Sequence, residues 1–447
     1  MHIMEVARRQ FLSTPSSELA FTCFSELAST CFLELAFRLA WSVILFLSCR
    51  SFNFNKAPAV DSNHMAAASD LDERGVLRTE SGHEIPQLTL TGAMLMNRTV
   101  ALYGASNSGK TIFTKHIMKL LNGPVEQVLL VSPTEPSNRS YEGYVAPPFI
   151  HSRLYLPDPA NPKKDDGPKG ALRFLNAVWQ RQEMMAAIYT RVNDADVLGS
   201  LYRRLPRGPR AEGLRYITAM NERRVRLLAQ LQQRHGGDAG RCAEQVKGVN
   251  AKFEQMLVLL YKKYIAPAHA SLWARPDLTE DEAYALTYLN FNPRLLLVFD
   301  DCAAELKSLF SKEIFRKLFY QNRHSMVTLV MCCQDDTDLP ANLRKNVFVS
   351  IFMSEVVCQS NFERGANQFG KAMRAVVAAV APEVFRGTRK LAYIRDDPRG
   401  QHLYHVSVPS PTPAIFGSDA LQELCAAVQS DSVSMDTDNP FYSHFRL

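Results

Sequence analysis

Short apolar runs alternate with amphipathic segments in two separate parts of the chain. In the first part, residues 100–103 predict a strand, residues 111–121 a helix, and residues 127–133 a second strand. The helix prediction rests on apolar residues at helical spacing and on the stop residues Asn122-Gly123-Pro124. The order strand, helix, strand predicts a parallel sheet with helices on both faces, which is an α/β fold.

The second part of this pattern begins after residue 292. Apolar runs predict strands that end at Asp300 and near Cys333, and a further strand over residues 347–353. Residues 311–324 predict an amphipathic helix, and residues 390–408 predict a β-hairpin. We expect these elements to complete the same sheet.

The intervening residues 157–292 have a helical pattern that is rich in arginine. Within residues 214–234, apolar and basic positions separate at helical spacing, with Ile217, Met220, Leu227, Leu228 and Leu231 against Arg223, Arg224, Arg226 and Arg234. Residues 203–210, with two prolines, predict a basic loop. A helical insertion with solvated charges and a nucleic-acid contact surface both account for this composition.

We therefore expect five regions along the chain. These are a repetitive apolar leader (1–64), the first part of an α/β core (65–156), the helical insertion (157–292), the second part of the core (293–408) and a flexible tail (409–447). The leader is expected to be an appended segment or a mis-assigned start. Its apolar stretch, residues 39–49, is shorter than the roughly 20 residues of a membrane-spanning helix, so a membrane anchor is not expected.

Composition narrows the class of protein only slightly. Hydrophobic residues make up 46% and charged residues 21% of the chain, as in ordinary globular proteins, and the net charge of +6 allows a polyanionic partner without requiring one. The nine cysteines include no CxxC pair. This usage favours free thiols in a reducing, intracellular compartment over a disulfide framework or a zinc site.

The loop after the first predicted strand matches the phosphate-binding motif GxxxxGK[ST]. Its glycines let backbone N–H groups surround phosphate oxygens, Lys110 is placed to meet the β- and γ-phosphates, and the Thr111 hydroxyl coordinates Mg²⁺. The flanking strand and helix are the context that this motif requires. We predict a site for ATP and Mg²⁺ formed by Gly104, Ala105, Ser106, Asn107, Ser108, Gly109, Lys110 and Thr111.

Polar residues follow the later strands where ligands bind in parallel α/β sheets. Asp300 is expected to hold Mg²⁺, and Asp301 to act as general base toward the attacking water. A turn or helix cap is the alternative role for this acidic pair. Gln334 is expected to sense the γ-phosphate or orient water, and Arg323 or Arg344, near the same edge, to reach a neighbouring subunit's nucleotide as an arginine finger.

Taken in order, these motifs resemble the DNA-packaging ATPases of large eukaryotic DNA viruses and Maverick/Polinton elements, which belong to the FtsK/HerA superfamily. The resemblance extends over residues 88–408, with the insertion only loosely matched. It is carried by GASNSGKT, SPT with the following Asn and Tyr, VFDDC, NRH, the strand-end Gln and LRKN. It implies a P-loop NTPase of RecA/FtsK-HerA type, with a mainly parallel sheet, a large helical insertion and a C-terminal β-hairpin.

The resemblance also implies what the protein does. Such relatives form ring oligomers, usually hexamers, that use ATP and Mg²⁺ to drive double-stranded DNA into a preformed capsid. It places Lys110 and Thr111 at the phosphates and Mg²⁺, Asp300 at Mg²⁺, Asp301 where many relatives have Glu, and Gln334 as sensor. The implied partners are double-stranded DNA, other copies of the chain, and capsid or portal-vertex proteins, at the site of virion assembly in the host cell or in the virion.

Two other function classes stay open at this point. A P-loop switch or scaffold that hydrolyses ATP poorly is compatible with the shorter Asp301 side chain. A P-loop kinase for a small acceptor is disfavoured, because no arginine-rich lid adjoins a recognisable acceptor pocket.

Overall fold

The computed structural model describes part of the chain in detail. The described residues are Leu71, 75–158, 160–161, 165–235, 239–397, 400–419 and Gln422. They all belong to the second of two compact units, Asn53–Leu447. The predictions for residues 1–64 and for residues 423–447 lie outside the described residues.

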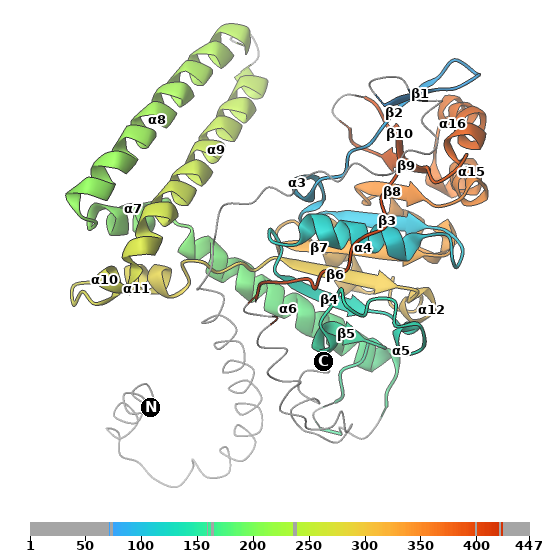
Figure 1. Ribbon diagram of the computed structural model, residues 1–447, viewed down its shortest axis with the longest axis horizontal. Helices are drawn as coiled ribbons and strands as arrows, with labels where there is room; N and C mark the ends of the chain where they lie inside the picture. The colour runs from blue at the N-terminus through green and yellow to red at the C-terminus, as the bar shows by residue number, and fades with distance from the viewer. Residues whose placement is uncertain are drawn as a thin grey trace. The chain divides into compact units, whose positions relative to one another are not determined.

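An eight-stranded sheet forms the centre of this unit (Figure 1). Its strand order is β10-β9-β8-β3-β7-β6-β4-β5. The strands are β3 (Thr99–Tyr103), β4 (Gln127–Val131), β5 (Ile150–His151), β6 (Leu295–Asp300), β7 (Val327–Cys333), β8 (Val349–Phe352), β9 (Lys390–Ile394) and β10 (Leu403–Val406). The six strands from β8 to β5 run parallel, whereas β9 and β10 are antiparallel to their neighbours. A separate small sheet pairs β1 (Val76–Arg78) with β2 (Glu84–Pro86).

The mainly parallel sheet confirms the predicted P-loop NTPase fold and its β-hairpin of β9 and β10. The central strands are continuous apolar runs because both faces of the sheet are covered, so every side chain of β3, β6 and β7 is buried. β7 lies between β3 and β6, which brings the carboxyl ends of these three strands to one edge of the sheet.

Side chains of β3 alternate between two apolar cores. Val100 and Leu102 face the side covered by α3 (Gly92–Leu95) and α4 (Lys110–Leu121). Ala101 and Tyr103 face the other side. That side is covered by α6 (Pro168–Val192), α12 (Ala303–Leu306), α13 (Glu313–Tyr320), α15 (Glu355–Glu363) and α16 (Lys371–Val384). Along α4 it is Phe113 that is buried, while Ile112 is 42% exposed.

The Arg-rich region contains a third core of its own. Its helices are α7 (Ala195–Arg203), α8 (Arg207–His235), α9 (Ala239–Ile265), α10 (His269–Trp273) and α11 (Glu280–Thr287). The core residues include Leu198, Leu201, Tyr264, Ile265 and Leu286. By contrast, α6, which precedes these helices, belongs to the core of the sheet through residues such as Phe174 and Trp179. The long helices α8 and α9 pack side by side, and we call this pair the helical hairpin (Figure 1).

The predicted basic loop over residues 203–210 is wrong. α7 continues to Arg203 and α8 begins at Arg207, so only three residues connect them. Pro209 lies in the first turn of α8, where the missing proline N–H has no intrahelical partner to lose. Arg204 forms ion pairs with Asp277 at 2.6 Å and Glu282 at 2.9 Å, so it anchors α7 to the segment around α11.

The first residues of the segment expected to be a flexible tail are packed against the sheet. Phe416 is 2% exposed and lies in the core beside α4. The Tyr144 hydroxyl donates to the Pro411 carbonyl at 2.8 Å, and the Phe416 N–H donates to the Tyr144 carbonyl at 2.8 Å. Among the described helices, none is both long and apolar enough to cross a bilayer.

Candidate active site

The loop after β3 adopts the tight geometry that its glycines allow. The Gly104 N–H donates to the Cys333 carbonyl at 3.1 Å, which ties the start of the loop to β7. A Cβ atom at Gly104 would lie 2.5 Å from both Met353 Cβ and Ser108 Oγ, so only glycine fits there. Gly109 has φ +100° and ends the loop directly before α4.

Lys110 and Thr111 occupy the first turn of α4. Lys110 is 8% exposed, and its ammonium donates to the carbonyls of Gly104 and, at 2.9 Å, of Ala105. The cation therefore lies inside the curve of the loop, where its partners are neutral carbonyl oxygens. Thr111 is half-buried at the N-terminus of the helix, whose free N–H groups favour anions.

Asp300 ends β6 at the same sheet edge. It is 7% exposed, and its Oδ2 accepts a hydrogen bond from the Tyr141 hydroxyl at 2.8 Å. Burial raises the pKa of Asp300, while the bond from Tyr141 and the charge of Lys110 act in the opposite direction. A buried carboxylate with a lysine within electrostatic range is well suited to hold a divalent cation.

Asp301 and Gln334 meet across the neighbouring strand ends. The Gln334 Nε2 donates to Asp301 Oδ1 at 2.7 Å. Asp301 has φ +58°, a left-handed conformation that turns the chain sharply after β6. The structure therefore joins the predicted general base to the predicted sensor by a direct hydrogen bond, which the sequence alone could not show.

A third carboxylate, Glu135, lies at this edge and is not among the residues predicted from the sequence. It begins α5 (Glu135–Asn138), which follows β4, and is 7% exposed. Its Oε1 accepts the Tyr141 N–H at 2.8 Å, and its Oε2 is buried without a hydrogen-bond partner. Burial raises the pKa of Glu135. Its only signal in the sequence is its place within the SPTEPSN stretch after an apolar run.

Tyr141 links the two buried carboxylates. Its backbone N–H donates to Glu135 and its hydroxyl donates to Asp300, so it holds the ends of β4 and β6 together. The Lys115 ammonium lies 4.2 Å from the centroid of the Tyr144 ring and 6.0 Å from that of Tyr141. Lys115 is one helical turn after Thr111, so this cluster borders the phosphate-binding helix.

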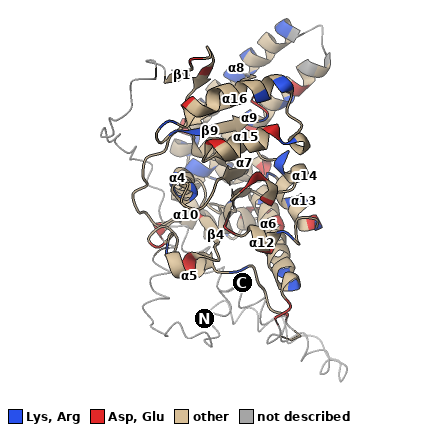
Figure 2. Ribbon diagram, turned by 90° about the vertical axis from the view of Figure 1, so that its right-hand side faces the viewer, with Lys and Arg blue, Asp and Glu red and all other residues tan. Residues whose placement is uncertain are grey.

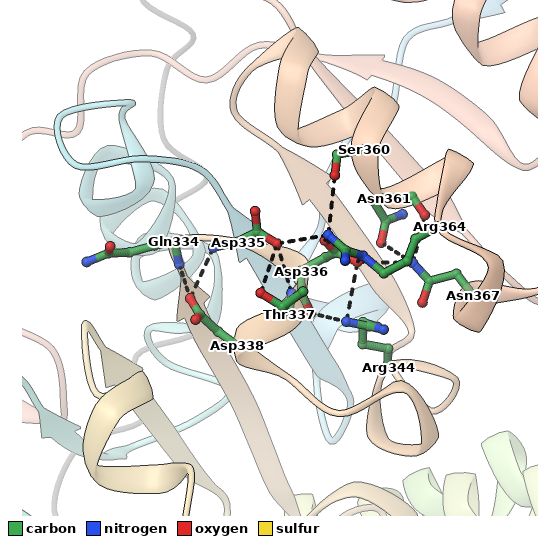
Figure 3. A network of polar contacts seen from close by, with 10 residues as sticks. All are labelled: Gln334, Asp335, Asp336, Thr337, Asp338, Arg344, Ser360, Asn361, Arg364 and Asn367. Atoms are coloured by element: carbon green, nitrogen blue, oxygen red, sulfur yellow. Dashed lines mark hydrogen bonds and ion pairs between the residues drawn. The ribbon is translucent and has the colours of Figure 1, made fainter.

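Arg344 is held within its own subunit. It ends α14 (Ala341–Arg344), is 10% exposed at the side chain, and forms an ion pair with Asp336 at 3.3 Å. Asp336 is fully buried, and its Oδ2 also accepts hydrogen bonds from Arg364 Nε at 2.9 Å and from Asn367 Nδ2 at 3.1 Å (Figure 3). A buried arginine with an internal carboxylate partner cannot extend to a neighbouring nucleotide without breaking that pair, so the arginine-finger role expected for Arg344 is not supported.

The same network fixes the backbone next to Gln334. Asp338 Oδ2 accepts the N–H groups of Gln334 at 2.8 Å and Asp335 at 3.0 Å (Figure 3). Because Asp336 is anchored to Arg364 at the end of α15, the short helix Asp336–Asp338 that follows Gln334 is attached to a rigid element. The network thus positions the amide that contacts Asp301.

Arg323 lies at the opposite edge of the sheet from the phosphate-binding loop. It precedes β7, whereas the candidate site lies beyond the carboxyl end of that strand. Arg323 is exposed and lines a cavity of about 770 Å³ together with Arg98 and Lys345. The expectation that Arg323 shares an edge with Asp300 and Gln334 is therefore wrong. A contact from this edge to another subunit's nucleotide stays a prediction.

Comparison with known proteins identifies the relatives of this chain. It is 48% identical over 374 residues to an uncharacterized protein, B354L, in several isolates of African swine fever virus. The match includes 83% of this chain and 99% of the viral protein. The chain belongs to the B354L family. No family model matches it.

Solved structures similar to this B354L-family protein are distant. The genome packaging NTPase B204 from Sulfolobus turreted icosahedral virus 2 has a TM-score of 0.28 and 10% identity, with 70% of this chain and 98% of that chain covered. VirB4 of Thermoanaerobacter pseudethanolicus has a TM-score of 0.29 and 11% identity, with 76% and 97% covered. Likeness at this level does not bear on the function of the B354L family.

The residues of this B354L-family site have the donor chemistry that Mg²⁺ requires. Mg²⁺ binds oxygen ligands and is usually held by one or two side chains together with substrate phosphates. The Thr111 hydroxyl and the Asp300 carboxylate supply such oxygens, from α4 and β6 respectively. Lys110, in the adjacent turn, supplies the fixed positive charge for the phosphates.

Proposed function

We propose that this protein hydrolyses ATP and uses the energy to move double-stranded DNA into a viral or virus-like capsid. The observation that carries the proposal is the arrangement at one sheet edge. A phosphate-binding loop after β3, a buried acid at the end of β6 and an Asp301–Gln334 hydrogen bond of 2.7 Å lie together there. A loop that only bound nucleotide would not need the last of these.

The chain's own groups suit an in-line attack of water on the γ-phosphate. Phosphate oxygens replace the carbonyls of Gly104 and Ala105 as partners of Lys110, and the N-terminus of α4 stabilises their charge. Mg²⁺, when bound, neutralises charge that develops on the phosphates. Asp301 accepts the proton of the attacking water on its other carboxylate oxygen, and the hydrogen bond from Gln334 holds Asp301 in position.

Support for DNA as the load comes from two sources. The ordered motifs from GASNSGKT to LRKN resemble those of viral DNA-packaging ATPases, and the B354L relatives are themselves proteins of a virus. On this basis the active form is a ring, usually a hexamer, at the site of virion assembly, with capsid or portal-vertex proteins as further partners. DNA contact needs only Lys and Arg on phosphates, without base readout.

A nucleotide-dependent switch is the second candidate function. Asp301 has a shorter side chain than the Glu of many packaging ATPases that the motifs resemble, and it is already bonded to Gln334, which limits its reach toward water. A kinase for a small acceptor is the third candidate function, and the experiment below also distinguishes it.

The proposal is tested by measuring phosphate release with and without linear duplex DNA. DNA-stimulated release supports the motor, tight ATP binding without release supports the switch, and transfer to a small acceptor supports the kinase. The Lys110→Ala variant is the control, because loss of the loop's cation is expected to abolish tight ATP binding in all three cases.

A further inference from the structure

The helical hairpin is strongly cationic. α8 and α9 together hold twelve Lys and Arg residues and four Glu residues, and basic positions recur along α8 in Figure 2. None of the described Lys and Arg side chains of the two helices forms an ion pair with a carboxylate. By contrast, Arg191 on α6, Arg204 directly after α7 and Arg275 shortly after α10 are all paired with acids.

One row of side chains on each helix shares a face of the hairpin. On α8 the spacing i, i+7, i+11 and i+18 aligns Tyr216, Arg223, Leu227 and Arg234. On α9 the spacing i, i+4, i+7 and i+11 aligns Lys252, Met256, Leu259 and Lys263.

A direct contact places these two rows on the same side of the hairpin. The Lys263 ammonium lies 5.5 Å from the centroid of the Tyr216 ring. Between two and three turns further along the hairpin, Arg224 stacks on Phe253 at 4.5 Å, which keeps the two antiparallel helices in this register. We call the eight residues of the two rows the cationic face.

The eight residues of the cationic face are exposed and include no acid; Glu212, one turn before Tyr216 on α8, is the exposed acid at its end. All four of its Lys and Arg residues are exposed. Its apolar members are also open, with Tyr216 at 50%, Leu227 at 41%, Met256 at 49% and Leu259 at 68%. A solvated helix surface normally mixes acidic and basic residues, so an exposed face with only cations and apolar side chains indicates a ligand.

We propose that the cationic face binds the phosphate backbone of double-stranded DNA. The inference rests on the proposed function for the identity of the polyanion. The two arginines of the α8 row, Arg223 and Arg234, lie about 17 Å apart along the helix, about half a turn of B-DNA, so both can meet phosphates of one duplex. Arg and Lys without carboxylate partners lose no internal ion pair when they bind phosphate.

Other occupants fit less well. A second copy of the same face would bring four cations against four cations, which repel. An acidic protein would match both the charges and the apolar side chains, and the experiment below separates it from DNA. In that case the apolar residues, and not only the charges, would carry the affinity.

The test is the salt dependence of DNA binding by the full chain, measured by fluorescence anisotropy of a labelled linear duplex without nucleotide. The variant Arg223→Gln, Arg234→Gln, Lys252→Gln and Lys263→Gln is expected to lower the slope of log K against log salt by about 3 to 4, since each phosphate contact contributes about 0.9. A conservative variant, with Arg and Lys exchanged at the same four positions, is expected to keep the slope.

A matched variant removes four exposed cations elsewhere, Lys307→Gln, Lys312→Gln, Arg316→Gln and Lys371→Gln, and is expected to change the slope by less than about 1. An unchanged slope in the hairpin variant, or an equal loss in the matched variant, overturns the inference. The inference is also overturned if the double variant Leu227→Gln, Leu259→Gln loses as much DNA affinity as the hairpin variant does.

The outcome is separable from that of the proposed function. Binding is measured without ATP, and the Lys110→Ala variant is expected to bind DNA as the unaltered protein does. If the salt slopes change as expected but DNA does not stimulate phosphate release, the result supports DNA binding by the cationic face and contradicts the proposed DNA-translocating activity.

Discussion

Two carboxylates compete for the role of general base, and single substitutions distinguish them. Asp301→Asn keeps the hydrogen bond to Gln334 but removes the basic oxygen, so we expect kcat to fall by about 10² to 10⁴ with ATP affinity unchanged. Steady-state phosphate release and equilibrium binding of a fluorescent ATP analogue check the two halves of this prediction.

Glu135→Gln is the matched comparison for the Asp301 variant. Its amide oxygen can still accept the Tyr141 N–H, so the fold around α5 is expected to persist. We expect kcat to stay within about threefold, well below the effect of losing a general base. A larger loss in Glu135→Gln than in Asp301→Asn would assign the base to Glu135, whose buried Oε2 has no internal partner.

Asp336 is the residue on which the Gln334 loop depends for its position. Asp336→Asn leaves the buried Arg344 without its carboxylate and leaves Arg364 with Asp335 alone, at 3.5 Å, so we expect the free energy of unfolding to fall by about 3 to 5 kcal/mol. Urea denaturation measures the change. Unaltered stability together with lost turnover in rings of mixed subunits would contradict this view and return Arg344 to a role at a neighbouring nucleotide.

Among the elements, α9 carries a charge that burial disfavours. Burial lowers the pKa of Lys262 to about 8, with the charge of Arg294 acting in the same direction, although its ammonium lies 5.7 Å from the centroid of the Tyr189 ring on α6. Lys262→Met is expected to raise the free energy of unfolding at pH 7 by about 1 to 3 kcal/mol, because the variant no longer buries a cation.

The pH dependence of that gain follows from linkage. Between the folded pKa near 8 and the unfolded value near 10.5, Lys262 binds a proton only in the unfolded state. The stability of the unaltered protein therefore rises with pH in this window relative to Lys262→Met. Thermal melts of both proteins are expected to converge between pH 8 and 10.5, and a constant gap would contradict the assignment.

The elements show which kinds of signal the sequence contains. Strands such as β6 and β7 were predictable because burial on both faces demands continuous apolar runs. The short α7–α8 connection was not predictable. Pro206 and Pro209 suggest a loop when only the local sequence is considered, but proline is tolerated at the start of a helix. Likewise, α6 is amphipathic, and nothing in its pattern says which of two cores it covers.

The candidate site also contains some features that the sequence predicts and others that only the folded structure shows. The phosphate-binding loop is recognisable because its chemistry is concentrated in eight consecutive residues. The ion pair of Arg344 was not predictable because its partner, Asp336, is eight residues away and is buried by tertiary packing. Arg323 was placed at the wrong edge because it precedes its strand, and Glu135 was missed because its burial depends on Tyr141.

For the whole molecule, the central claim is that ATP hydrolysis at one sheet edge moves DNA. The sheet supplies the hydrolytic groups, and the helical hairpin supplies an exposed surface for phosphates. A motor couples these two parts, so that hydrolysis at the sheet moves the DNA held by the hairpin.

The most direct measurement is displacement of a triplex-forming oligonucleotide from linear duplex DNA by the full chain. We expect displacement that requires ATP, and none with Lys110→Ala or Asp301→Asn. ATP hydrolysis without displacement, at protein concentrations that saturate the DNA, would contradict the account.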